Sequence, residues 1–240
     1  MNRLALIVLL FLSLSRGMAQ HVSNVNFDEI NVEVSDSTSA LFYPQLIKRI
    51  LANDTTLNKV EFKHLYYGNV FQNYYHPYGA TEKQKLFFDA YRNGDAYKNV
   101  EALGLSVLKE NPVDLDVILK MVFLYNREKD VSKATLFAKI YVSFLEVIYA
   151  SGSGQDCENG FVVISVDDEY RITGDLGLTV IEQALIGSCD RLIFSKKGQK
   201  RKNRIKGLYF NVRMPLTYLS KSFDQSDLPE ADAEPDEEEE

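Results

Sequence analysis

The 240-residue sequence has no tryptophan, three histidines and two cysteines. The histidines (His21, His64 and His76) are scattered, and neither a His-Glu-x-x-His motif nor paired Cys-x-x-Cys motifs occur. Zinc sites usually need such spacings, so the sequence predicts no metal centre. Gly152-Ser153-Gly154 lacks the third glycine of a phosphate-binding loop, and we expect no helix directly after it. We therefore expect no cofactor.

The sequence also lacks an apolar run of about 20 residues, the length that a membrane-spanning helix needs. A shorter apolar stretch, Leu4 to Leu14, follows Arg3 and precedes Gly17-Met18-Ala19. A basic residue, a short apolar core and a small-x-small site are typical of a secretory signal. We expect residues 1–19 to be removed. The mature protein would then be periplasmic or secreted, with no transmembrane span.

Charge is unevenly distributed along the chain. The formal net charge is −7, but the segment from Asp224 onward has ten acidic residues and no basic one. Such a segment is expected to be disordered, so we predict an acidic tail over residues 224–240. The loop Lys196–Lys206 has seven basic residues and no aromatic residue. It could contact an anionic surface, although we favour a solvated hairpin tip, and we expect no nucleic-acid binding.

Up to residue 150 the apolar residues recur at helical spacing, which predicts six helices. Their expected ranges are 40–52, 59–70, 82–93, 95–110, 113–127 and 131–150. Alternation of Ile30, Val32 and Val34 predicts a short extended arm over residues 22–34 before them. The helices from Tyr97 to Val131 have the period of a tetratricopeptide-like repeat, but a plain stack of helical hairpins fits the pattern equally well.

Beyond Gly160 the pattern changes to strands. We predict a central strand at 161–166, a short helix through Leu178, Ile181 and Leu185, and strands at 190–195 and 208–214. The fold class is therefore α+β, with a helical region over 20–155 and a small mixed sheet over 156–223. If the first two strands are parallel neighbours, Cys157 and Cys189 come close enough for a disulfide. Two buried free thiols are the alternative.

An aromatic segment offers one group of candidate binding residues: Tyr66, Tyr67, Tyr74, Tyr75, His76 and Tyr78. Tyrosine combines an apolar ring with a polar hydroxyl, so these rings could line a ligand site. Tyrosines also commonly fill half-buried positions, and we favour packing between helices as their role.

The segment between the two regions offers the second group: Ser151, Ser153, Asp168, Glu169 and Tyr170. A catalytic serine would need a Gly-x-Ser-x-Gly turn between strand and helix, which is absent here. We expect Gly152 to be the left-handed residue that ends helix 131–150. The acids Asp167 to Glu169 lack the alternating spacing of a calcium loop, so we expect a turn with solvated carboxylates.

Several motifs together resemble a family of secreted bacterial proteins classed only as a domain of unknown function. They are FYPQLIKR, NDTTL, LYYG, PYG, SGSG, VISVDDEY and LYFNV, and they span residues 40 to 212. The resemblance implies an intact exported fold and no particular activity. The family usually has Ser-Gly-Asp-Gly where this chain has Ser153, so the resemblance implies no role for an acid at that position.

No catalytic constellation stands out in the sequence. Our first hypothesis is a non-enzymatic module that binds an envelope protein or a glycan, because stacked helices present a concave surface. The alternative is an envelope hydrolase with a site where the segment Tyr66–Tyr78 meets the segment Ser151–Glu169. A pocket that holds a carboxylate or histidine with a shifted pKa would favour the enzyme. A shallow apolar patch would favour the module.

Overall fold

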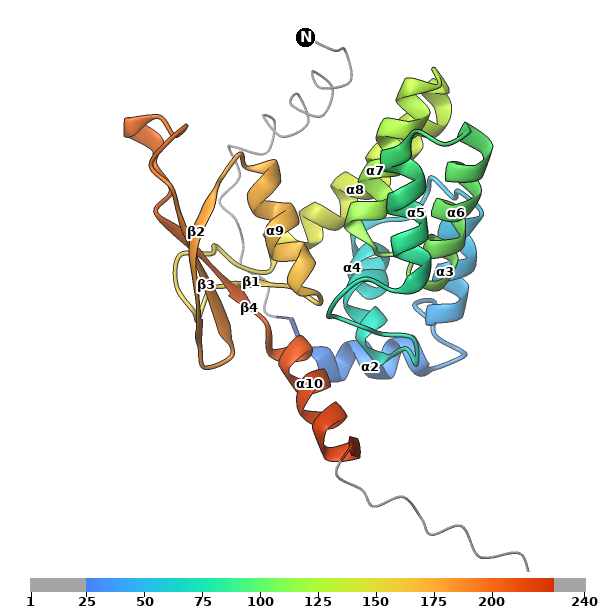
Figure 1. Cartoon of the computed structure of the whole chain (residues 1–240). Helices are drawn as coiled ribbons and strands as arrows, with labels where there is room; N and C mark the ends of the chain where they lie inside the picture. Colours follow the sequence, from blue (N-terminus) through green and yellow to red (C-terminus); the bar gives the residue numbers. More distant parts are fainter. Residues whose placement is uncertain (1–24, 227–240) are drawn as a thin grey trace, which may run out of the picture.

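The computed structural model describes residues 25–226, so the predicted signal and most of the predicted acidic tail lie outside the described residues. The fold is α+β, as predicted: a helical stack is followed by a small mixed sheet (Figure 1). A single hydrophobic core joins residues from both parts. Among residues 25–226, no helix has the length and apolar character to cross a membrane.

The helical stack contains the six predicted helices with small shifts at their ends. Pro44 lies in the first turn of its helix, and Asn58 and Thr81 each form a capping box with the residue three positions on. Gly94 ends its helix in the left-handed conformation, with φ 72°. The helices are α3 (Tyr43–Leu51), α4 (Lys59–Gly68), α5 (Glu82–Asn93), α6 (Tyr97–Glu110), α7 (Leu115–Arg127) and α8 (Val131–Ala150).

The predicted extended arm is wrong over the described residues, because helix α2 (Phe27–Ser35) replaces it from Phe27 onward; residues 22–24 lie outside the described residues. Phe27, Ile30 and Val34 are buried at the spacing of a helical face, whereas Val32 is exposed. The Asn26 side chain caps the helix by accepting a hydrogen bond from the Glu29 N–H. The same apolar residues that suggest a strand by alternation therefore also fit the buried face of a short helix.

The sheet has four strands in the order β1-β4-β3-β2. β1 pairs in parallel with β4, and β3 is antiparallel to both of its neighbours, so the sheet is mixed as predicted. The predicted central strand 161–166 is wrong, because β1 is a two-residue edge strand. The strands are β1 (Phe161–Val162), β2 (Val180–Ile186), β3 (Cys189–Phe194) and β4 (Gly207–Asn211).

The position of the predicted crossover helix is also wrong. Helix α9 (Val166–Asp175) lies earlier, between the helical stack and the sheet (Figure 1), and residues 180–186 form β2. Ser165 caps α9, and the three acids that follow occupy its first turn, where the helix dipole favours negative charge. The last predicted strand ends at Asn211, and helix α10 (Arg213–Ser226) includes the first residues of the predicted tail. The basic loop links the antiparallel strands β3 and β4 and contains the short 3-10 turn Arg201–Asn203.

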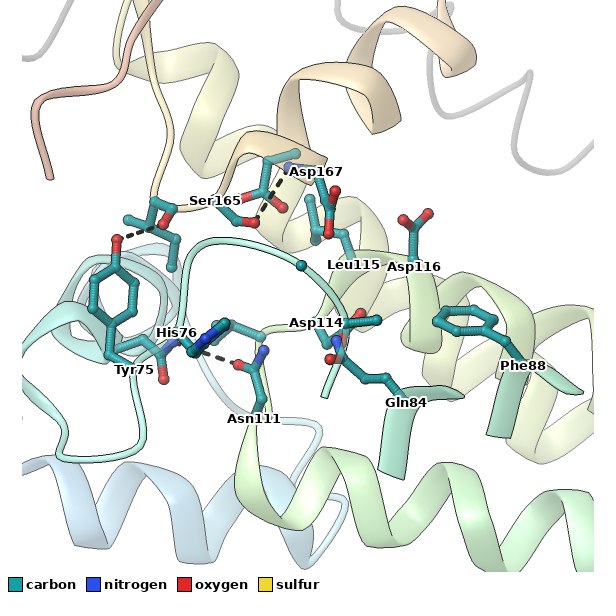
Figure 2. Close-up of a pocket in the computed structure, with 16 residues that line it drawn as sticks. Tyr75, His76, Gln84, Phe88, Asn111, Asp114, Leu115, Asp116, Ser165 and Asp167 are labelled. Carbon is teal, nitrogen blue, oxygen red and sulfur yellow. Dashed lines mark hydrogen bonds between the residues drawn. The ribbon is translucent and has the colours of Figure 1, made fainter. Parts of the chain in front are cut away.

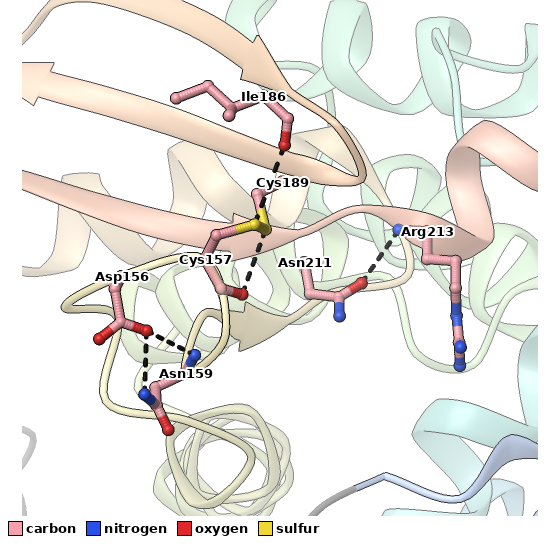
Figure 3. The surroundings of a disulfide bond; sticks show 7 residues. All are labelled: Asp156, Cys157, Asn159, Ile186, Cys189, Asn211 and Arg213. Atoms are coloured by element: carbon pink, nitrogen blue, oxygen red, sulfur yellow. Dashed lines mark hydrogen bonds between the residues drawn. A yellow bond between two sulfur atoms is a disulfide. The ribbon is translucent and has the colours of Figure 1, made fainter.

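β4 lies between β1 and β3, so the parallel pairing on which we based the disulfide does not exist. Cys157 and Cys189 are nevertheless bonded, with their Cα atoms 5.6 Å apart (Figure 3). The loop after α8 brings Cys157 to the start of β3, and Asn159 donates hydrogen bonds to the Asp156 carboxylate within that loop.

The same loop corrects our expectation for Gly152. It is Gly154 that has the left-handed conformation, with φ 68°. At Gly152 a Cβ atom would lie 2.5 Å from the carbonyl oxygens of Asn159 and Gly160. Glycine is needed at residue 152 because two parts of the backbone approach each other closely.

Three tyrosine hydroxyls connect the helical stack to the segment that runs from β1 to the first turn of α9. Tyr66 donates to the Asp168 carboxylate at 2.6 Å, and Tyr75 donates to the Ile164 carbonyl at 2.6 Å. Tyr67 donates to the Val162 carbonyl at 3.3 Å. The aromatic segment thus positions α9 and the residues before it.

Loss of the disulfide should destabilise the protein. The bond closes a loop with a sequence separation of 32, and cross-linking a loop of that size stabilises by about 3.7 kcal/mol in the chain-entropy model. The double variant Cys157→Ser, Cys189→Ser should lose that much free energy of unfolding in urea. A reductant should lower the stability of the wild type by the same amount and leave the variant unchanged. Equal stability of the two proteins without reductant would contradict the prediction.

Candidate functional site: a carboxylate-lined pocket

Two helix N-termini bring four aspartates together. At the start of α7, Asp114 caps the helix by accepting a hydrogen bond from the Val117 N–H at 2.9 Å, and Asp116 lies in the first turn. At the start of α9, Asp167 and Asp168 follow the capping residue Ser165. Because α7 and α9 are in contact, the acidic ends of both helices face the same space.

A pocket of about 70 Å³ lies at this junction and is lined by all four aspartates. Its other polar lining includes Gln84 from α5 and Asn111 from the turn before α7. In Figure 2, Asp114 and Gln84 meet deep in the pocket, and Asp116 and Asp167 lie side by side at its rim. We call this the acidic pocket.

Hydrogen bonds fix two of the four carboxyl groups. Gln84 Nε2 donates to Asp114 Oδ2 at 2.5 Å, and the Tyr66 hydroxyl donates to Asp168 Oδ2. At the rim, Arg171 pairs with Asp116 at 3.2 Å. Among the ion pairs of residues 25–226, only this one involves a carboxyl group of the acidic pocket.

Burial raises the pKa values of the deeper acids. Removal from water raises the pKa of Asp168 to about 8, the Tyr66 hydrogen bond opposes this, and the three neighbouring aspartates add to it. Burial raises the pKa of Asp114 to about 6, although the hydrogen bonds from Val117 and Gln84 oppose the shift. The pKa of Asp167 is raised by burial and by Asp116. Near neutral pH, Asp168 therefore holds a proton and Asp114 is mostly ionised.

This arrangement has two chemical uses. Ionised and ionisable carboxyl groups with amide oxygens beside them can bind a cation, and two carboxyl groups with different pKa values can act as acid and base. Within the described residues, no set of three or more histidine, cysteine, aspartate or glutamate side chains is arranged to hold a metal ion.

Of the candidate site residues, the acidic pocket brings together Tyr75, His76 and Asp168. Tyr66 and Tyr67 are fully buried in the core, and neither lines the acidic pocket. Tyr67 lines a second, mostly apolar cavity. Ser151 is buried too. Its hydroxyl donates to the Ile148 carbonyl and accepts from the Val162 N–H at 2.8 Å, and the residue lines the second cavity with Tyr67.

The other candidates lie outside the acidic pocket. Ser153 is half-buried in the loop after α8, where its N–H bonds to the Asn159 carbonyl at 2.8 Å. Tyr74 is 39% exposed. The hydroxyl of Tyr170 donates to Gln183 on β2. Tyr78 is half-buried, and burial, followed by the nearby Glu169 and Asp190, raises the pKa of the tyrosine.

We expected a turn with solvated carboxylates, but the side chains of Asp168 and Glu169 are buried. Glu169 is fully buried on the side of α9 that faces the sheet. Neither of its carboxyl oxygens has a hydrogen-bond partner. Burial raises its pKa to about 9, and the neighbouring Asp190 and Asp168 add to the shift. The side chain is therefore protonated at neutral pH, because an unpaired buried charge would be very costly.

The sequence interpretation missed Asp114, Asp116, Asp167, Gln84 and Asn111 as site residues. One signal was available: Asp114 follows Asn111-Pro112 at the position of a helix cap. That pattern identifies a helix start, but only the tertiary contact with α9 brings the cap into a pocket.

A second cavity of about 210 Å³ lies between α4 and α8 and has mostly apolar lining. Its wall includes Val25, Tyr67 and Ser151.

Comparison with protein families gives one result. The family model "Domain of unknown function (DUF4919)" matches residues 28–221. The chain belongs to this family. The match agrees with the resemblance seen in the sequence and covers every residue of the acidic pocket. Neither the curated proteins nor the solved structures gave a match.

The buried acids predict that stability falls as pH rises. Glu169, Asp168 and Asp114 have folded-state pKa values above the unfolded values near 4, so the folded protein binds more protons. Their stabilising contribution is complete below pH 4 and is lost progressively up to about pH 9. Urea unfolding should therefore give a higher free energy of unfolding at pH 5 than at pH 9.

The variant Glu169→Gln should flatten this dependence, because it cannot ionise. At pH 9 it should be more stable than the wild type by roughly 1–3 kcal/mol. The exposed Glu158→Gln is the matched control and should follow the wild-type curve. A wild type that gains stability from pH 5 to pH 9 would contradict the explanation.

Proposed function

We propose that this protein is an exported envelope protein whose acidic pocket binds a primary ammonium group, such as the lysine side chain of a partner protein. The observation that carries the proposal is the charge of the pocket. Four carboxyl groups line it: Asp168 holds a proton near neutral pH, Asp114 is mostly ionised, and Asp116 pairs with Arg171 at the rim. A cationic group that enters would therefore meet carboxyl groups with few competing cations.

Geometry also favours an ammonium group over a larger cation. An ammonium group has three N–H donors, and the pocket offers acceptors on Asp114, Asp167 and the Asn111 amide. A cavity of about 70 Å³ accommodates one small group, whereas whole ligands need about 300–1,000 Å³. The rest of the ligand would remain outside, as it does when one side chain of a protein is bound.

Two features support export. The first residues combine Arg3, an apolar core and a small-x-small site, which is the pattern of a secretory signal. The disulfide between Cys157 and Cys189 suits the oxidising conditions outside the cytoplasm.

A second candidate function is hydrolysis. The acidic pocket lies where the aromatic segment meets the residues before α9, which is the location proposed for a hydrolase site. Its two buried aspartates differ in pKa, about 8 for Asp168 and about 6 for Asp114, so one could donate a proton while the other accepts one. We rank binding first because a glycosidase or esterase must enclose groups on both sides of the bond that it cleaves. A cavity of about 70 Å³ holds only one small group.

Binding can be measured by calorimetry with Nα-acetyl-lysine amide and with its Nε-acetylated form, which lacks the charge. We expect heat of binding only from the charged form. A bound cation favours ionised carboxyl groups, so binding should release protons and strengthen from pH 5 to pH 8 as Asp114 ionises. Asp114→Asn should weaken binding about tenfold, the loss expected for one charge-assisted hydrogen bond.

Asp95→Asn is a matched control, because Asp95 is exposed and lies outside the pocket. Glucosamine and N-acetylglucosamine form a second pair of probes, and binding of glucosamine alone would identify an amino sugar as the ligand instead. No heat from any charged probe with folded protein, or equal heat from charged and acetylated forms, would refute the proposal. In that case, turnover of chromogenic glycosides and esters would test the hydrolase.

A further inference from the structure

β2 forms one edge of the sheet and is paired on one side only, with β3. Gly187 and Ser188 connect the two strands, and the pair Ile186–Cys189 closes this two-residue hairpin. In such a hairpin the closing residues bond to each other and the bonded pairs then alternate. Gln183 and Leu185 therefore direct their N–H and C=O groups away from β3, toward solvent.

The outer edge of β2 lacks the features that usually prevent strands from pairing with other chains. Protected edge strands have lysine, proline or a high charge, but β2 reads VIEQALI and has a single charge, Glu182. Three of its apolar side chains are exposed: Ile181 by 64%, Leu185 by 57% and Ile186 by 47%. An exposed seven-residue strand of this composition is suited to pairing.

The order of residues along β2 suits antiparallel pairing with β2 of a second copy. The stretch from Glu182 to Ile186 is regular, since the bulge of this strand lies before it. If two copies pair in antiparallel fashion about Ala184, Gln183 and Leu185 of one copy bond to Leu185 and Gln183 of the other. Glu182 then lies opposite Ile186 of the other copy, and the two negative charges are kept apart.

From these observations we infer that the protein forms a two-fold dimer in which the β2 strands of two copies pair antiparallel about Ala184 and join their sheets into one. A second copy provides hydrogen-bond partners for the outward N–H and C=O groups of both Gln183 and Leu185. It also covers Leu185 and Ile186 on both sides of the two-fold axis. The acidic pocket lies between α7 and α9, away from the outer edge of β2, so this inference does not depend on the proposed function.

Sedimentation velocity over a wide range of protein concentration tests the dimer. The full chain should be purified in the form that the producing cell yields. A matched pair of variants at one exposed position tests the register. Ile186→Lys places a positive charge opposite Glu182 of the other copy, and Ile186→Glu places a negative charge there. The glutamate variant should dimerise about tenfold more weakly than the lysine variant, because opposite charges across a sheet stabilise and like charges destabilise.

Adding Glu182→Lys to the Ile186→Glu variant should restore dimerisation. Val32→Lys is the control: Val32 is 69% exposed on α2, so this substitution should leave the dimer unchanged. Circular dichroism of each variant establishes that it is folded. A wild type that is monomeric at every concentration would overturn the inference. So would a dimer that responds equally to lysine and glutamate at residue 186, because the register would then be wrong.

Discussion

The hydrogen bond from Tyr66 to Asp168 joins the helical stack to α9, and the position of the acidic pocket depends on it. Tyr66 is on α4 in the centre of the stack, whereas Asp168 is in the first turn of α9 next to the sheet. The Tyr67 hydroxyl bonds to the Val162 carbonyl in β1, and the Tyr75 hydroxyl bonds to the Ile164 carbonyl between β1 and α9. Each such bond contributes about 1 kcal/mol to stability, but together they determine where a whole helix lies.

The same contact places acids in a costly environment. Asp168 and Glu169 are adjacent on α9, and both are removed from water, one toward the helices and the other toward the sheet. The dipole of α9 favours negative charge at this end, yet desolvation outweighs it and raises both pKa values. A protein that retains such groups loses stability as the pH rises through their pKa values.

Much of the fold could be predicted from the sequence, because the helices α3 to α8 have strong apolar periodicity and four of them (α4, α5, α7 and α8) begin with a capping side chain. Prediction failed where the apolar pattern of a short segment fits both a strand and a helix. Phe27 to Val34 fits both alternation and a helical face, and packing against α4 selects the helix. The motif VVISVDDEY looks like a buried strand, but Ser165 starts a helix there. The acidic pocket was predictable only in part, because Tyr75, His76 and Asp168 meet Asp114 through tertiary contacts that no local pattern encodes.

A double-mutant cycle on Tyr66 and Asp168 tests this account most directly. The free energy of unfolding in urea would be measured for wild type, Tyr66→Phe, Asp168→Ala and the double variant. We predict a coupling energy of about 1–2 kcal/mol, because each single variant removes the same hydrogen bond. In an Asp168→Asn background, which keeps an oxygen acceptor, Tyr66→Phe should still be destabilising. Additive effects in the alanine cycle would contradict the claim that this hydrogen bond joins the two parts of the fold.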